Sequence, residues 1–288
     1  MAFFFIAEKF YYLSTPQPIY ATTPTDIIKN VEIPLPPLAE QERIVAKIEE
    51  LFSQLDAGLE SLKTAQAQLK IYRQAVLKYA FEEGKENYKS HILNDISEKI
   101  QIGPFGSQLH QEDYIENGIP LINPMHIKAG KIVPNYSYSI KMEKRDSLPN
   151  YIMKSGDVIM GRRGEMARCG LVTEKENGWF CGTGSLYIRP VEKSVDSTFL
   201  YYYLRSETTK KYLEDNAGGT TMANLNSKIV KNIPVFLPTL EQQQRIVEEI
   251  ESRLSVCDKL KETIRASLKQ AEALRQSILK QAFEGKLL

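Results

Sequence analysis

Two stretches of the chain, 202 positions apart, have nearly the same sequence. LAEQERIVAKIEELFSQLD begins at Leu38, and LEQQQRIVEEIESRLSVCD begins at Leu240. Residues 21–82 align with residues 223–284 without a gap and share 24 identities in 62 pairs. This repeat constrains the architecture more than any local motif, because the same structural unit must occur twice.

Each copy predicts an extended, proline-rich turn followed by one long helix. Apolar residues recur mostly at steps of three, four or seven over about five heptads, which is typical of a coiled coil. Pro37 and Pro238 precede the two helices, and Gly84 and Gly285 follow them. Each helix would be roughly 65 Å long. We expect the copies to pack antiparallel around a pseudo-twofold axis; the alternative is two helices of one irregular helical domain.

The residues between the repeats predict an α+β domain with many loops. Short apolar segments bounded by glycine, proline or asparagine indicate strands, and STFLYYYLRSETTKKYLEDN at 197–216 indicates a helix. The predicted strands are GIPLIN (118–123), GDVIM (156–160), CGLVT (169–173) and SLYIRP (185–190). The predicted fold class is therefore α+β, with one globular domain and two long helices.

Positive charge is concentrated in one part of this domain. Residues 126–168 contain nine Lys or Arg and four Asp or Glu, in a chain whose formal net charge is +1. GDVIMGRRGEMARCG predicts a buried strand that leads into a loop carrying Arg162 and Arg163 between Gly161 and Gly164. Arginine suits phosphate and guanine edges, and glycine permits close approach of the backbone to a ligand. The alternative is a solvated loop with Asp157 or Glu165 as ion-pair partners.

Two further glycine loops are candidates for the same surface. CGTGSLYIRP (181–190) and AGGTTMANLNSK (217–228) expose N–H groups and hydroxyls that can bind phosphate. Their alternative interpretation is ordinary turns.

The remaining chemistry argues for a binding protein. Cys169, Cys181 and Cys257 form no CxxC pair, so we expect no disulfide framework and a reducing, cytoplasmic setting. The chain contains three dispersed histidines, no GxGxxG, no P-loop and no nucleophile motif, so we expect no metal site, no cofactor and no catalytic residues. NPMH at 123–126 only faintly matches the Asn-Pro-Pro-aromatic motif of amino-methyltransferases. The start, MAFFFIAEKF, lacks the basic region of a signal peptide.

The combination of these motifs resembles the specificity subunits of type I DNA restriction–modification systems. The resemblance rests on the doubled EQxRIV helix, AFEGKLL, GPFGSQL (103–109), GDVIMGRRG and GTGSLYIRP. In that family two target-recognition domains alternate with two long helices, each domain reads half of a bipartite DNA site, and the helices bind modification (methyltransferase) subunits. The resemblance implies a non-catalytic DNA-recognition subunit that directs methyltransferase and restriction subunits to a target site.

The resemblance also implies a division of the chain. We expect a remnant of a first target-recognition domain at 1–32, conserved regions at 33–85 and 233–288, and one complete target-recognition domain at 86–232. Double-stranded DNA would contact Lys128, Lys131, Arg162, Arg163, Gly164, Arg168, Gly182, Thr183, Ser185, Gly219, Thr220, Thr221 and Asn224. Modification subunits would contact Gln41, Phe81, Arg43, Gln243, Arg245 and Phe283.

The incomplete first domain leaves alternatives open. Because the remnant would expose a surface that a missing domain would cover, we expect that the chain could form a homodimer or pair with another specificity chain. The other possibilities are a coiled-coil scaffold for protein binding and an inactive recombination cassette of a specificity gene.

Overall fold

The computed structural model describes residues 35–217 and 225–288, and these residues form two compact units. In the described part of the chain, one unit comprises residues 35–68 and Lys259–Leu288, and the other comprises Leu69–Asp258. The boundary between the two units crosses both long helices. The predicted remnant at 1–32 lies outside the described residues.

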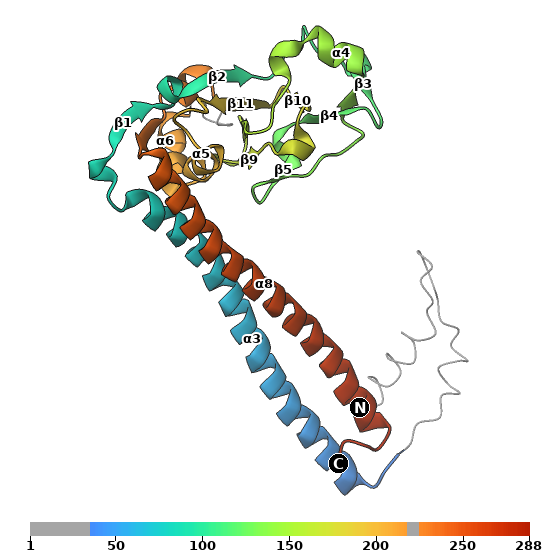
Figure 1. Ribbon diagram of the computed structural model, residues 1–288. Helices are drawn as coiled ribbons and strands as arrows, with labels where there is room; N and C mark the ends of the chain where they lie inside the picture. Colours follow the sequence, from blue (N-terminus) through green and yellow to red (C-terminus); the bar gives the residue numbers. More distant parts are fainter. Residues whose placement is uncertain (1–34, 218–224) are drawn as a thin grey trace. The chain divides into compact units, whose positions relative to one another are not determined.

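Both long helices begin and end where the sequence predicts (Figure 1). α3 spans Leu38–Glu82 and α8 spans Leu240–Phe283. The carbonyl of Pro37 accepts the first N–H bonds of α3, from Glu40 and Gln41. Beyond the helix ends, Gly84 and Gly285 have φ of 70° and 68°, and only glycine adopts this left-handed conformation without steric cost.

The smaller unit consists of the parts of α3 and α8 that lie within 35–68 and Lys259–Leu288. Its buried residues are Ile44, Ile264, Ile278 and Ala282. Arg275 donates to Asp56 at 3.0 Å, and its guanidinium lies 4.5 Å from the ring centroid of Phe52. These contacts show that the predicted apolar seam is formed in this unit.

The larger unit contains the equivalent ion pair. Here Arg73 of α3 donates to Asp258 of α8 at 2.5 Å. In the repeat, which has an offset of 202 residues, Asp56 is equivalent to Asp258 and Arg73 is equivalent to Arg275. Each ion pair therefore joins an Asp of one copy to an Arg of the other copy, and the two ion pairs are equivalent. The α8 partner falls from 275 to 258 as the α3 partner rises from 56 to 73, which is the antiparallel arrangement predicted. Exposed pairs of this kind contribute about 1 kcal/mol or less each, so they fix register more than stability.

One four-stranded antiparallel sheet, of order β2-β11-β8-β9, forms the centre of the larger unit. Its strands are β2 (Ser97–Ile102), β8 (Val158–Gly161), β9 (Cys169–Leu171) and β11 (Ser185–Pro190). Three of them match predicted strands, and β2 was not predicted. Four of the six residues in its sequence, SEKIQI, are polar, so it lacks the apolar run that marked the others.

A second four-stranded sheet has the order β10-β4-β7-β3, with β10 parallel to β4. Its strands are β3 (Tyr114–Ile115), β4 (Ile119–Ile122), β7 (Ser139–Ile140) and β10 (Phe180–Cys181). Two antiparallel strand pairs complete the unit: β1 (Lys89–Ile92) with β12 (Pro234–Leu237), and the hairpin β5 (Ile127–Lys128) with β6 (Lys131–Ile132).

The helix predicted at 197–216 is divided in two. α5 (Ser197–Leu204) ends before Ser206, whose hydroxyl accepts the N–H of Thr209 and so caps α6 (Glu207–Asn216). A serine at this position favours a new helix start over continuation. The other short helices are α4 (Met142–Ser147), α7 (Ser227–Lys231), η1 (Lys85–Asn87), η2 (Leu93–Ile96), η3 (Gln111–Asp113), η4 (Pro124–His126), η5 (Pro149–Tyr151) and η6 (Glu174–Glu176).

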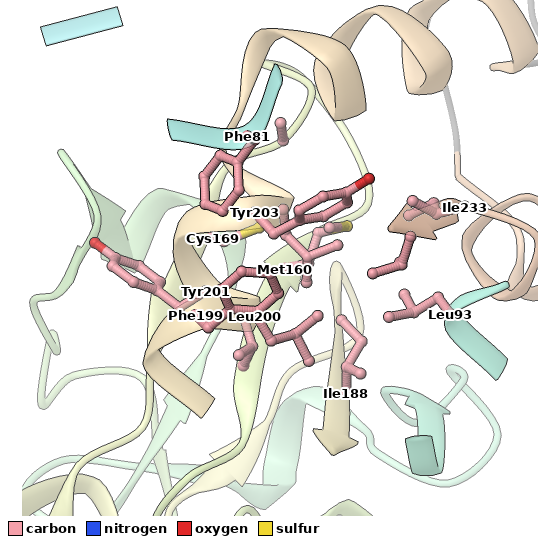
Figure 2. Close-up of a cluster of buried hydrophobic side chains, with 14 of the residues drawn as sticks. Phe81, Leu93, Met160, Cys169, Ile188, Phe199, Leu200, Tyr201, Tyr203 and Ile233 are labelled. Carbon is pink, nitrogen blue, oxygen red and sulfur yellow. The ribbon is translucent and has the colours of Figure 1, made fainter. Parts of the chain in front are cut away.

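The main core of the larger unit lies between the central sheet, α5 and the end of α3 (Figure 2). Phe81 of α3 makes edge-to-face contacts with Phe199 and Tyr203 of α5, at centroid separations of 5.5 and 5.2 Å. Ile188 of β11 and Met160 of β8 belong to the same buried cluster. The central sheet therefore buries one face against helices from two distant parts of the sequence.

The opposite face of the sheet carries a buried ion pair. Arg189 Nε and Nη2 donate to the two carboxylate oxygens of Asp157 at 2.8 and 2.7 Å, and the N–H of Lys154 donates to the same carboxylate at 2.7 Å. Asp157 is 1% exposed. Burial raises the pKa of Asp157, and the hydrogen bonds from Arg189 oppose that rise. The arginine guanidinium also lies 5.3 Å from the ring centroid of Tyr187.

Replacement of Arg189 by methionine should destabilise the protein by about 3 to 5 kcal/mol at neutral pH, because it leaves a buried carboxylate without its counter-ion. The loss should be smaller in mild acid. A carboxyl group whose pKa is raised by folding binds its proton more tightly in the folded state than in the unfolded state. As pH rises and the proton is lost, the unpaired Asp157 carboxylate therefore lowers the free energy of unfolding further. Chemical denaturation at several pH values measures this dependence.

The double variant Asp157→Asn, Arg189→Met is the matched control. It removes both charges and should recover most of the stability lost in Arg189→Met. Equal stability of the two variants at neutral pH would contradict the importance of the unpaired charge.

Candidate nucleic-acid interface

The loop that follows β8 is fixed tightly to its neighbours. The N–H of Arg162 donates to the carbonyl of Gly184 at 2.9 Å. A Cβ atom on Gly161 would lie 3.1 Å from the Pro124 side chain, and Gly164 has φ of 82°. Both flanking glycines therefore have a steric or conformational role, and the loop has a defined backbone path.

Arg162 points inward, although the sequence predicted a DNA contact. Its side chain is 8% exposed, Nε donates to the carbonyl of Leu225 at 3.0 Å, and Nη1 donates to the carbonyl of Thr183 at 3.4 Å. The N–H of Leu225 donates back to the carbonyl of Arg162 at 3.0 Å. A planar guanidinium can join several carbonyls at once, which the loop sequence alone does not reveal. Arg162 therefore joins three chain segments.

Arg163, the next residue, is exposed. In the part of the chain that the structure describes, its guanidinium has neither an ion pair nor a hydrogen bond. Glu165, one of the alternative partners, instead pairs with Arg168 at 3.2 Å, and Asp157 pairs with Arg189. Of the two adjacent arginines, Arg163 is the one placed to bind a ligand.

Arg168 is half-buried and connects this loop to the segment after β4. Its Nη1 donates to the carbonyl of Pro124 at 3.2 Å, and the same side chain pairs with Glu165. Part of its hydrogen-bonding capacity is therefore used inside the protein, so it is a weaker candidate for DNA contact than Arg163.

The Gly182–Ser185 loop packs backbone against backbone. A Cβ atom on Gly103 would overlap the Gly182 carbonyl oxygen, and the N–H of Gly184 donates to Asn123 Oδ1 at 3.1 Å. Gly182 and Ser185 are buried, and Thr183 and Gly184 are half-buried. Ser185 Oγ has no hydrogen-bond partner among the described residues. These glycines allow loops to meet closely, so of the predicted residues of this loop only Thr183 remains a candidate for a ligand contact.

The two predicted lysines lie on the β5–β6 hairpin. Lys128 and Lys131 are both exposed, and they lie opposite each other in the register of the two strands. Ala129 and Gly130 form the turn with φ of 51° and 84°, and the Tyr201 hydroxyl donates to the Gly130 carbonyl at 3.0 Å. This two-residue turn with two positive φ values suits a twisted hairpin, and α5 holds it in place.

Sequence reasoning missed the residues that organise these loops. Asn123 receives the N–H of Gly184, and its own N–H donates to Nδ1 of His126 at 3.1 Å. His126 is 2% exposed, and burial lowers its pKa. NPMH is therefore a structural turn that other loops pack against. Gly219, Thr220, Thr221 and Asn224 lie outside the described residues.

The residues predicted to bind modification subunits divide into two groups. Gln243 is fully buried: its Nε2 donates to the carbonyls of Pro238 and Ser194 at 2.9 Å, and its Oε1 accepts the N–H of Asp196 at 2.8 Å. Phe81 is part of the core. These two side chains are thus occupied within the protein.

The second group is more accessible. Arg43 and Arg245 are exposed, and Arg245 pairs with Glu241 one helical turn away. Gln41 is half-buried and donates to the carbonyl of Pro36 at 2.8 Å, and Phe283 is half-buried. Among the predicted contacts, the two arginines are therefore the most accessible side chains.

Within residues 35–217 and 225–288, no three or more His, Cys, Asp or Glu side chains are grouped so that they could hold a metal ion. In the same residues, no helix has the length and apolar character needed to cross a membrane.

Comparisons with known proteins match this architecture. The chain is 29% identical over 312 residues to the EcoBI type I restriction enzyme specificity subunit of Escherichia coli, which covers 97% of this chain and 66% of that protein. It is 27% identical over 283 residues to the MjaVIII specificity subunit of Methanocaldococcus jannaschii, covering 91% and 63%. The chain thus spans slightly less than two thirds of the length of these relatives.

Solved structures share the fold. The crystal structure of the HsdS subunit from Thermoanaerobacter tengcongensis matches with a TM-score of 0.61 and 23% identity, over 98% of this chain and 67% of that one. A chain from a study of assembly and conformational transition in the type I R-M system matches with a TM-score of 0.77 and 24% identity, over 98% and 68%.

The family profile described as "Type I restriction modification DNA specificity domain" matches residues 85–270, which include the loops around Arg162 and much of α8. The chain belongs to this family.

Proposed function

We propose that this chain recognises a specific sequence in double-stranded DNA through the loops of residues 86–232. The observation that carries the proposal is the exposed guanidinium of Arg163, which has no ion pair or hydrogen bond among the described residues and stands on a loop fixed by Arg162. A fixed loop loses little conformational freedom on binding, so such an arginine can select a base or a phosphate. Membership in a DNA specificity family supports the same conclusion.

The proposed recognition relies on local charge. The formal net charge of the whole chain is only +1, so long-range attraction of DNA to the protein as a whole is weak. Arg163, Lys128 and Lys131 supply exposed positive charge on loops of one compact unit. Binding should therefore depend on salt, with a slope set by a few phosphate contacts.

Replacement of Arg163 by alanine should weaken binding to duplexes selected from a random-sequence pool by about 1 to 3 kcal/mol. Base reading by Arg163 would relax the preference at one position, whereas phosphate binding would reduce the salt slope by about one. Fluorescence anisotropy over a range of salt concentrations distinguishes these results. Arg265→Ala removes one positive charge from an exposed site on α8 and is the matched control.

Arg162→Met should behave differently from Arg163→Met. Loss of the Arg162 guanidinium leaves carbonyls of Leu225 and Thr183 without this donor, so the free energy of unfolding should fall by about 1 to 3 kcal/mol. Arg163→Met should leave stability unchanged within about 0.5 kcal/mol. Denaturant titration of both variants tests the assignment, and equal stabilities would overturn it.

The proposed role in the cell is to direct methyltransferase and restriction subunits to the recognised site. Modification subunits would bind the exposed positions Arg43 and Arg245, which the repeat makes equivalent. Restriction subunits would join through the modification subunits. The internal bonds of Gln243 and the buried ring of Phe81 give these two residues a structural role within the protein in place of a direct partner contact.

The double variant Arg43→Glu, Arg245→Glu should lose co-purification with the modification subunit, because two exposed cations become anions. Lys261→Glu, Lys269→Glu makes the same charge change at other exposed positions of α8 and should retain the partner. Size-exclusion chromatography of the co-expressed proteins gives the readout. Retention of the partner by both double variants would exclude the arginines as its contacts.

A second copy of the chain, or another specificity chain, is the proposed partner at the Gln41 end. The bond from Gln41 to Pro36 repeats the bond from Gln243 to Pro238. Gln243 also holds Ser194 and Asp196 of its own recognition domain. Gln41, the equivalent of Gln243, is thus suited to binding the segment around Ser194 and Asp196 of a second recognition domain. Leu38, close to Gln41 in the sequence, is 70% exposed and would be covered in such a contact.

Sedimentation velocity at micromolar concentrations should therefore show self-association. Leu38→Asp should weaken it, because the charged side chain would have to be desolvated in the contact. Val256→Asp alters a comparably exposed apolar side chain of the larger unit, at 56%, and should not. A monomer at all concentrations would leave a different specificity chain as the partner to be tested by mixing.

A further inference from the structure

The GPFGSQL loop, residues 103–109, holds an aromatic ring in solvent between two anchored ends. Phe105 is 60% exposed. At the first end, the N–H of Gly103 donates to the carbonyl of Ser185 at 3.0 Å. A side chain on Gly103 would overlap Gly182, so the backbones of the two loops are in contact.

The second end of the loop is held equally well. Leu109 is 6% exposed and lies in a buried cluster with Tyr151 and Phe180. The hydroxyl of Tyr151 donates to Gln108 Oε1 at 2.6 Å, and the N–H of Gln108 donates to the carbonyl of Phe105 at 2.9 Å. The backbone that carries Phe105 therefore closes a turn whose following residues are fixed in the core.

The ring belongs to the same set of loops as Arg163. Gly103 contacts Gly182 and Thr183, the carbonyl of Thr183 accepts from Arg162, and Arg163 is the next residue. The Gly182–Ser185 loop thus contacts both the loop that carries Phe105 and the loop that carries Arg163. A single exposed apolar side chain is common on protein surfaces, but anchoring at both ends and proximity to the candidate DNA loop require a more specific explanation.

We propose that Phe105 is a specificity-determining residue that makes an apolar contact with DNA bases, an inference that rests on the DNA-binding function proposed above. Phenylalanine can contact the thymine methyl group in the major groove or insert between base steps in the minor groove. Both contacts read base identity or stacking without an ionic bond. Phe105 would thus supply selectivity, while the cations supply the salt-dependent part of the affinity.

The experiment uses the full chain and a fluorescent duplex selected by the wild type from a random-sequence pool. Phe105→Ala should lower affinity for this duplex about tenfold, as expected for the loss of one aromatic base contact. It should leave affinity for unselected duplexes unchanged. The slope of log affinity against log salt should stay at the wild-type value, because no phosphate contact is removed.

Two controls separate the contact from a change in folding. Tyr79→Ala removes another exposed aromatic ring of the same unit, 49% exposed on α3, and should bind as the wild type does. Phe105→Tyr retains the ring and should recover most of the affinity. Thermal unfolding of Phe105→Ala should match the wild type, since the ring is largely outside the core.

The possible results distinguish the two proposals. If Phe105→Ala keeps wild-type affinity and base preferences while Arg163→Ala loses affinity, the role of Phe105 is overturned and the function stands. If the wild type binds all duplexes equally, both proposals fail. If Phe105→Ala changes the salt slope as Arg163→Ala does, the ring acts through phosphate contacts of the loop, and its role as a base contact is overturned.

Discussion

The candidate DNA surface depends on main-chain carbonyls being held by one arginine. Arg162 donates to Leu225 and Thr183, while its own backbone bonds to Gly184 and Leu225. Loops have many polar backbone groups, and these must be paired when loops pack together away from water. An arginine can pair several of them at once without needing a regular strand. The exposed residue that follows, Arg163, is consequently presented from a fixed backbone.

The long helices were predictable because the information lies in local sequence. A repeated apolar seam, prolines before it and glycines after it determine both the type and the limits of α3 and α8. The antiparallel pairing also follows from the repeat, and the exchange of Asp56–Arg275 with Arg73–Asp258 confirms it. Where the prediction erred, as in the single helix at 197–216, a serine cap outweighed a continuous helical pattern.

The candidate site was predictable only in part. Sequence shows that GRRG and GTGS are loops with arginine and glycine, and these loops do meet. It does not show which of two adjacent arginines turns inward, because that depends on carbonyls that are 21 and 63 residues away in the chain. The importance of Asn123 was missed for the same reason: its bond to Gly184 joins residues 61 positions apart. Tertiary hydrogen bonds to backbone groups leave no pattern in one sequence.

Glycine has two different roles in this fold, one at the ends of the long helices and the other in the packed loops. At Gly84 and Gly285 it ends a helix, where backbone conformation alone requires it. At Gly103, Gly161 and Gly182 it removes side chains that would hold the loops apart. The first use is local and leaves a recognisable signal, whereas the second brings an arginine loop and an aromatic loop against a common backbone. Because that backbone is shared, a change that displaces the backbone of one loop should shift the residues on the other two. Selectivity for a DNA sequence would therefore be a property of the packed loop set, in which a single contact residue has its effect only while its neighbours remain in place.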